Sequence, residues 1–200
     1  MEAPKAAAFG AAFERQGWGL FSVNLHLQPL IMTMEEKEQF VRSRLIALLN
    51  GLPTETKASW GKMTVQQMIE HFADYMRITS GKVLYTDIIT PPDQLDKMRS
   101  FLESEKPFRE NTRNPLMPEV PAPVRNPSKA EAIKELKEEI DYFFKVFEKN
   151  KLQVTRNPFF GDLSYEQNIK LTYKHAMHHL RQYGVVLYTP ETAIEGEQVT

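Results

Sequence analysis

Four stretches of this chain combine a helix-capping signal with apolar residues at helical spacing, and this pattern limits the folds open to it. Each signal pairs a hydroxyl residue with Glu or Gln three positions later, at Thr33 and Glu36, Thr64 and Gln67, Ser128 and Glu131, and Ser164 and Gln167. Apolar residues three or four positions apart place one face of each helix in a core. The sequence therefore predicts an all-α fold, a four-helix bundle with long connections.

Turn residues indicate where these helices end. The first is expected to stop at Asn50 and Gly51, the second near Ser80 and Gly81, and the last near Gly184. After the second helix, KVLYTDIIT is either a short strand or an extended connection. A brief additional helix, DQLDKMRSFLES, is predicted after two consecutive prolines.

Composition limits both the number of domains and the kinds of partner. The 200 residues suit one domain, and a formal net charge of -1 gives no general attraction for nucleic acid. Because the chain has no cysteine, disulfides, thiolate zinc sites and cysteine nucleophiles are excluded. Any metal site must use nitrogen and oxygen ligands.

We expect three segments along the chain. Residues 1–32 are a leader or N-terminal extension, residues 33–190 form the helical domain, and residues 191–200 are a C-terminal tail. The apolar run in the first segment is too short for a membrane span and lacks the basic start of a secretion signal. An added leader, a packed extension and a targeting peptide remain open for it, and a cytoplasmic location is the default expectation.

The last predicted helix carries three histidines in KHAMHHLRQYG, residues 174–184. His175 and His179 lie about 40° apart around a helix, on a face that also carries Gln182, whereas the apolar residues of this helix lie roughly opposite. The two imidazoles therefore face either water or a polar cavity inside the bundle. Residues at positions i and i+4 can place two imidazole nitrogens on one cation.

His71 lies in the middle of the second helix, among the apolar residues Met68, Phe72 and Met76. A histidine in such a place either bonds to a carbonyl or carboxylate, or acts as a ligand. Three histidines with an open remaining position are a usual arrangement for catalytic metal. His71, His175 and His179 are therefore candidate metal ligands.

Two longer motifs carry a family resemblance. SWGKMTVQQMIEH ends at His71, and RNPFFGDLSYEQNIKLTYKHAMHHLRQYG contains the histidine cluster. Together they resemble the DinB-like superfamily of YfiT-like metal-dependent hydrolases, from Trp60 to Gly184. The resemblance implies a four-helix bundle, often dimeric, with one divalent metal, commonly zinc or nickel, on His71, His175 and His179. Three imidazoles also accept iron or manganese.

Other polar residues near these positions have two readings each. In the wider superfamily Arg usually follows the last ligand directly, but here Leu180 follows it and Arg181 comes next. Arg181 either anchors an anionic substrate group or favours the helix C-terminus. Gln67 and Asp74 share a face with His71 and either orient the imidazole or bound water, or are solvated.

Aromatic and proline-rich segments flank the predicted site. Trp60 and the turn at residues 157–161 either line the metal pocket or fill the core. Six of the thirteen prolines fall between Pro107 and Pro127, so we expect an irregular segment there. Because long ordered loops are uncommon without a function, this segment is predicted to cross the mouth of the site as a lid.

Three functions are compatible with these features. The first is a metal-dependent hydrolase or transferase acting on a small molecule, in which the metal activates water or a thiol cosubstrate; thiol-dependent transferases and isomerases among DinB-like proteins imply the thiol chemistry. The second is a non-catalytic metal-binding or stress-associated protein. In the third there is no metal, and the histidines form a polar or pH-responsive face. No nucleic acid or membrane partner is expected. A homodimer is implied by the family resemblance alone.

The helical geometry assigns different roles to the clustered histidines. His178 and His179 diverge by about 100°, so one cation cannot readily take both together with His175. His178 is therefore expected in the pocket wall. Replacing His175 or His179 with Ala should abolish tight metal binding, whereas His178→Ala should keep the metal and change activity or stability. Metal analysis of the three variants tests this; loss in His178→Ala with retention in His179→Ala contradicts it.

Overall fold

The computed structural model describes residues 32–112 and 114–185. The predicted leader therefore lies outside the described residues except for Met32, as does the whole predicted tail at residues 191–200. The elements, in chain order, are α1 (Met34–Gln39), the π-helix η1 (Phe40–Arg44), α2 (Leu45–Gly51), α3 (Val65–Thr79), α4 (Pro92–Glu103), α5 (Lys129–Lys149), β1 (Thr155–Asn157), β2 (Gly161–Leu163) and α6 (Tyr165–Gln182). The structure is mostly helical with one small sheet.

The predicted helix starts match the structure. Thr33, Thr64 and Ser164 each cap a helix through a reciprocal capping box, and Ser128 accepts a hydrogen bond from the backbone N–H of Glu131 at the start of α5. The last helix ends at Gln182, and Gly184 follows with a φ of 73°. Glycine adopts this left-handed backbone without the steric cost of a Cβ, which explains the stop.

The first predicted helix differs from expectation in its middle. The backbone N–H of Leu45 bonds to the carbonyl of Phe40, five residues back, so a π-helical segment separates α1 from α2. Such widened turns are not visible in apolar spacing, because one extra residue per turn leaves the buried stripe largely intact. Phe40, Val41 and Leu45 remain buried across it.

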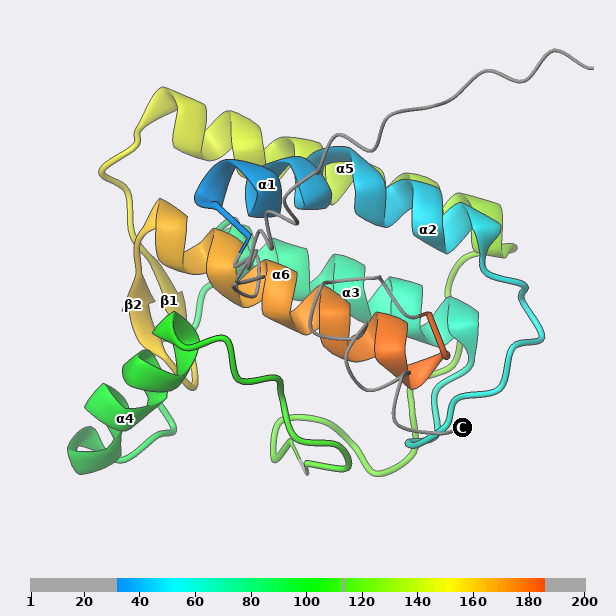
Figure 1. The fold of residues 1–200 in the computed structure, drawn as a ribbon, viewed down its shortest axis with the longest axis horizontal. Coiled ribbons are helices and arrows are strands. Elements are labelled where there is room, and N and C mark those ends of the chain that lie inside the picture. The colour runs from blue at the N-terminus through cyan, green and yellow to red at the C-terminus, as the bar shows by residue number, and fades with distance from the viewer. Residues whose placement is uncertain (1–31, 113, 186–200) are drawn as a thin grey trace, which may run out of the picture.

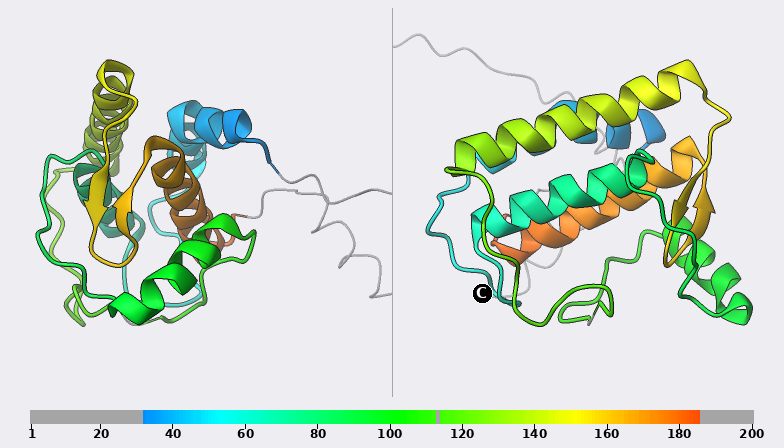
Figure 2. Two further views of the ribbon diagram at one scale, coloured as in Figure 1. Left: turned by 90° about the vertical axis from the view of Figure 1, so that its left-hand side faces the viewer. Right: turned by 180° about the vertical axis from the view of Figure 1, so that it is seen from behind.

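The long helices form two layers, with α5 and the α1–α2 segment in one and α3 and α6 in the other (Figures 1 and 2). Their apolar faces meet in one core, which includes Phe72 and Met76 of α3, Phe143 of α5 and Leu180 of α6. The prediction of a mostly helical fold is confirmed. The four-helix count stays a prediction, since η1 divides the first helix and α4 adds another.

A short antiparallel hairpin between α5 and α6 was not predicted. β1 pairs with β2, with Asn157 opposite Gly161, so the turn expected at residues 157–161 joins two strands. Strands of three residues are too short to show an alternating pattern. Phe160 packs in a second apolar cluster with Leu102 of α4 and Leu171 of α6, so the hairpin and α4 cover one end of α6.

The stretch at residues 82–90 is a connection without regular structure, which decides between the two alternatives left open for it. It lies against the hairpin: Ile89 donates its N–H to the Pro158 carbonyl at 2.7 Å, and Arg156 donates to the Thr86 carbonyl at 2.9 Å. The backbone N–H of Ile89 and the carbonyl of Thr86 thus find hydrogen-bond partners in the hairpin, and neither needs a neighbouring strand.

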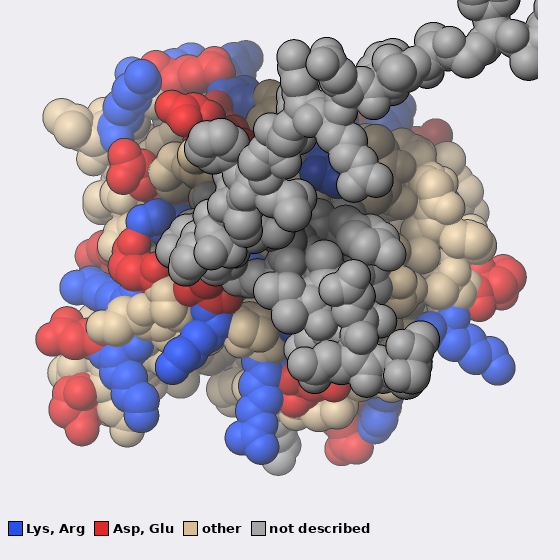
Figure 3. All heavy atoms as spheres, in the orientation of Figure 1, with Lys and Arg blue, Asp and Glu red and all other residues tan. Residues whose placement is uncertain are grey.

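Charges of both signs are interspersed on the face drawn in Figure 3, in line with the net charge of -1. Within residues 32–112 and 114–185, no helix is long and apolar enough to cross a membrane.

An ion-pair network ties the end of the proline-rich segment to α3 and α5. Glu135 of α5 accepts hydrogen bonds from Arg77, from Arg125 at 3.0 Å and from Asn126 at 2.6 Å. The buried carboxylate of Glu70 accepts the backbone N–H groups of Arg125 and Asn126, both at 2.9 Å. Hydrogen bonds to charged groups are among the stronger ones in proteins, so residues 125–126 are held firmly.

Glu135 should make stability sensitive to acid. Burial alone raises the pKa of its carboxyl, but the bonds from Arg77, Asn126 and Arg125 outweigh this and lower the pKa below the ordinary 4.5. A lowered folded-state pKa contributes stability above the unfolded-state pKa, and this contribution is lost as pH falls through the folded-state value. We expect Glu135→Gln to cost about 1–3 kcal/mol at pH 7.

Urea unfolding of Glu135→Gln at pH 7 and below pH 4.5 measures both effects, since the cost should shrink in acid. The matched control is Glu138→Gln, which changes an exposed glutamate on the same helix. An equal cost for both variants at pH 7 would contradict the role assigned to Glu135.

Candidate metal centre

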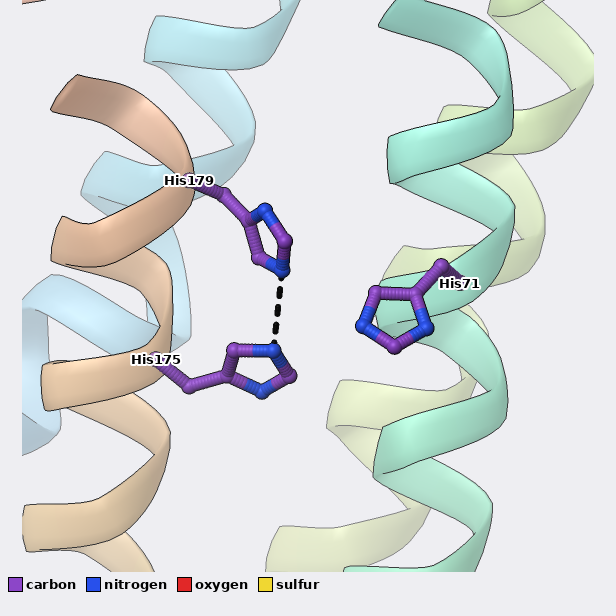
Figure 4. A group of neighbouring side chains, drawn as sticks. All are labelled: His71, His175 and His179. Atoms are coloured by element: carbon purple, nitrogen blue, oxygen red, sulfur yellow. Dashed lines mark hydrogen bonds between the residues drawn. The ribbon is translucent and has the colours of Figure 1, made fainter. Parts of the chain in front are cut away.

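Three histidines from two helices meet between α3 and α6 (Figure 4). His71 projects from α3, and His175 and His179 project from adjacent turns of α6. One ring nitrogen from each lies within 4.8 Å of the others, and the Nε2 atoms of His175 and His179 are 2.9 Å apart. The structure thus brings together the three residues that the sequence singled out as candidate ligands.

The histidines of α6 face protein rather than water. His179 is buried, and both its ring and that of His175 lie about 5 Å from the His71 ring, at 5.2 and 5.3 Å between centroids. Of the two orientations left open by the sequence, the inward one is therefore observed. Phe72 and Tyr75 of α3 complete the wall, with centroids 4.9 and 4.4 Å from the His175 ring.

Gln182 determines the tautomer of His179. The amide nitrogen of Gln182 donates to the Trp60 carbonyl at 2.7 Å, so its Oε1 is free to accept from Nδ1 of His179 at 2.9 Å. With the hydrogen on Nδ1, the lone pair of His179 is on Nε2, the atom that faces His175 and His71. An outer hydrogen bond of this kind is typical of metal-binding histidines.

The loop before α3 holds Gln182 in place. Ser59 donates its backbone N–H to the Gln182 carbonyl at 2.7 Å, and the Gln182 side chain itself is buried. Gly61 has a φ of 79°, and a Cβ there would lie 2.6 Å from Nε2 of Gln182. A side chain at position 61 would therefore push away the amide that orients His179.

Burial keeps the three imidazoles neutral. It is the largest cause lowering the pKa of each ring, reinforced for His175 by its histidine neighbours, and the pKa of His179 falls to about 3. Neutral imidazoles keep a lone pair for a cation at neutral pH. Zn–N bonds of 2.0–2.1 Å put ligand nitrogens of a tetrahedral site about 3.3 Å apart. The Nε2 atoms of His175 and His179, 2.9 Å apart, are near that spacing, and a nitrogen of His71 lies within 4.8 Å of both, so the donor set fits a divalent metal.

His178 lies beside the three-histidine cluster rather than in it. Its ring is 5.4 Å from that of His179 and 5.8 Å from that of Trp60. Burial first, and Arg181 next, lower its pKa, while a bond to the Phe108 backbone opposes them. His178 thus lies next to the cluster, and its role in a pocket wall stays a prediction.

Arg181 lies in the last turn of α6, where a positive charge favours the helix C-terminus, and its role toward an anionic group stays a prediction. Its Nη2 donates to the Phe108 carbonyl at 3.2 Å, so it attaches the proline-rich segment to α6. The Phe108 ring lies 6.4 Å from that of His175 and 6.0 Å from that of His178. Phe108 was missed in the sequence because nothing in its neighbourhood specifies which helix the segment crosses.

Gln67 and Asp74 have structural partners other than the imidazole of His71. Gln67 completes the capping box of α3 and donates to the Ala122 carbonyl at 2.8 Å. Asp74 pairs with Arg77 and Arg125, and reaches His71 as a more distant charge that raises its pKa against burial. Both residues therefore bind the proline-rich segment, Gln67 at Ala122 and Asp74 at Arg125.

The proline-rich segment runs on the histidine side of the molecule. Near its start Phe108 contacts α6, and near its end Ala122 and Asn126 accept hydrogen bonds from Gln67 and Gln66 of α3. It thus passes from α6 to α3, the two helices that supply the histidines (Figure 1). Whether it opens as a lid stays a prediction.

Comparison with known families agrees with this geometry. The family model described as DinB superfamily matches residues 39–183, most of the chain. The chain belongs to the DinB superfamily. No curated protein matches it. The DinB match includes all three histidines and Gln182, and it begins after the predicted leader, for which it carries no information.

Gln182 should control the metal affinity of this DinB protein without being a ligand. Loss of the bond to Nδ1 in Gln182→Ala frees the ring to rotate and to adopt the other tautomer, so affinity should fall about 10–100-fold. Gln182→Glu keeps the acceptor for Nδ1 but loses the donor to the Trp60 carbonyl, so its affinity should lie between those of the unchanged protein and Gln182→Ala. Competition with a chromophoric chelator measures the metal affinity of both Gln182 variants. Gln94→Ala, at an exposed position, is the control. Unchanged affinity in Gln182→Ala would exclude this role.

Proposed function

We propose that this DinB-superfamily protein is a metal-dependent enzyme that acts on a small molecule by hydrolysis or by thiol-dependent transfer. Residues His71, His175 and His179 would hold one divalent ion. The observation that carries the proposal is the meeting of three neutral imidazoles from α3 and α6, with the lone pair of His179 directed into the group by Gln182. Zinc and nickel are the preferred ions, although iron and manganese also accept imidazole.

The bound metal would supply a Lewis acid that makes a coordinated water or thiol more acidic at neutral pH. The protein's own contribution is to position the ligands and to limit access of bulk water. Gln182 fixes the ring of His179, and the half-buried His71 approaches from the opposite helix. The aromatic rings of Phe72, Tyr75 and Phe108 surround His175. Apolar walls around a site strengthen its electrostatic interactions.

We further propose that α1 to α2, α3, α5 and α6 act as the four helices of a bundle whose site opens toward the proline-rich segment. The hydrogen bonds of Arg181 and Gln67 to that segment support this placement. A homodimer is part of the same proposal, from the resemblance alone. A non-catalytic metal-binding protein remains the alternative function.

Metal binding is tested by elemental analysis of protein made without a histidine tag. We expect one divalent ion per chain, and its loss in His71→Ala, because two imidazoles bind a divalent ion much less tightly than three. His178→Ala is the matched control, as it removes a neighbouring imidazole outside the cluster. Far less than one ion per chain after reconstitution would refute the proposal.

Catalysis is tested separately with a screen of ester and thiol substrates, run with metal-loaded and chelator-treated protein. Turnover that requires both the metal and His71 supports an enzyme. Full metal content without turnover of any substrate would favour the non-catalytic alternative.

A further inference from the structure

Three buried nitrogen atoms beside the candidate metal centre have no hydrogen-bond partner among the described residues. They are Nε1 of Trp60, Nδ1 of His178 and Nε of Arg181. Among the described residues, one other buried side-chain nitrogen lacks a partner, Nε of Arg99 on α4. A buried polar group left without a partner costs about 1–3 kcal/mol, so three in one place need an explanation.

The three groups share one neighbourhood. The rings of Trp60 and His178 are 5.8 Å apart, and Arg181 follows His178 by three residues on α6, close enough to lower its pKa. His178 in turn lies 5.4 Å from the ring of His179. A molecule bound by these groups would therefore have its other end near the three-histidine cluster.

The chemistry of the three groups specifies what they would bind. The indole N–H of Trp60 and the guanidinium N–H of Arg181 can only donate, whereas Nδ1 of His178 donates or accepts according to its tautomer. Two fixed donors, one on a cation, suit an acceptor that carries negative charge. Carboxylates and phosphates meet this requirement, and Arg is the residue that recognises their planar or forked oxygens best.

We infer that Trp60, His178 and Arg181 form a subsite for an oxyanion, a carboxylate or phosphate, on the small-molecule substrate. The inference rests on the proposed function for the identity of that molecule as substrate. It adds that the substrate is anionic and is held by a group distinct from the metal ligands.

The present partner of Arg181 is one that an oxyanion can replace. Among described residues, its guanidinium bonds to the neutral carbonyl of Phe108, at 3.2 Å. An oxyanion can accept two parallel hydrogen bonds from one guanidinium and adds the attraction between opposite charges, neither of which a neutral carbonyl offers. A bound oxyanion would thus replace the Phe108 carbonyl as the acceptor for Arg181. It would also accept from the unpaired N–H groups of Trp60 and Arg181, where the proline-rich segment contacts α6.

The indole N–H of Trp60 allows a direct test by ¹H–¹⁵N NMR. The chain has two tryptophans, so Trp18→Phe leaves a single indole signal. This protein is titrated with propionate, with its neutral analogue propionamide and with inorganic phosphate, both as purified and after chelation. We expect a saturable shift with propionate or phosphate, and none with propionamide, because an amide carries no negative charge.

Arg181→Gln tests the cation. It should weaken the oxyanion about tenfold or more, the effect of losing one charge-assisted contact. The matched control is Arg99→Gln, which removes the same charge and a similarly unpaired buried nitrogen near Gly161, on α4, and should leave the affinity unchanged. If Arg181→Gln does not fold, Arg181→Lys keeps the charge without the fork and should still weaken binding.

A shift with propionate alone identifies a carboxylate subsite, a shift with phosphate alone a phosphate subsite, and both support the inference. No saturable shift, an equal shift with propionamide, or unchanged affinity in both Arg181 variants overturns it. The two proposals fail separately. Oxyanion binding by the chelated protein would sustain the subsite whatever the metal does, whereas less than stoichiometric metal in the purified and reconstituted protein would refute the metal-dependent function alone.

Discussion

The hydrogen bond between His179 and Gln182 is the interaction on which the candidate centre depends. It places the hydrogen of a buried imidazole on Nδ1 and leaves the Nε2 lone pair facing the other two rings. The same glutamine reaches the Trp60 carbonyl, so the entry of the chain into α3 and the end of α6 are joined through one side chain. Gly61 leaves room for it. The end of α6 and the loop before α3 are thereby connected to the candidate ligand His179.

The proline-rich segment connects to the same two helices by different means at its two ends. At residues 125–126 it is bound by the carboxylates of Glu70 and Glu135, which accept several strong hydrogen bonds. At Phe108 it meets α6 through one bond from Arg181 and through ring contacts. A charged ligand competes more readily with the second attachment than with the first. Substrate charge and the position of this segment are therefore coupled in the proposed subsite.

The helix starts and the ligand candidates were accessible from local sequence, because both depend on spacing within one helix. Capping boxes are complete within four residues, and the angular positions of His175, His178 and His179 follow from helical rotation. The π-helical turn at Phe40 and the hairpin around Pro158 were not accessible. The π-helical turn changes the backbone hydrogen bonds but keeps the apolar residues on one face. The strands of the hairpin are too short to show an alternating apolar pattern.

The sequence by itself determined a mostly helical chain with four capped amphipathic segments, the DinB resemblance, and the three histidines that could act as ligands. The tertiary structure decided which face of α6 is inside and that Gln182, rather than Gln67 or Asp74, forms a hydrogen bond to the ring of a candidate ligand. It also decided that Trp60, His178 and Arg181 share a neighbourhood. These are contacts between residues up to about 120 positions apart, as for Gln182 and Trp60. Such contacts depend on how helices pack, which helical periodicity does not specify.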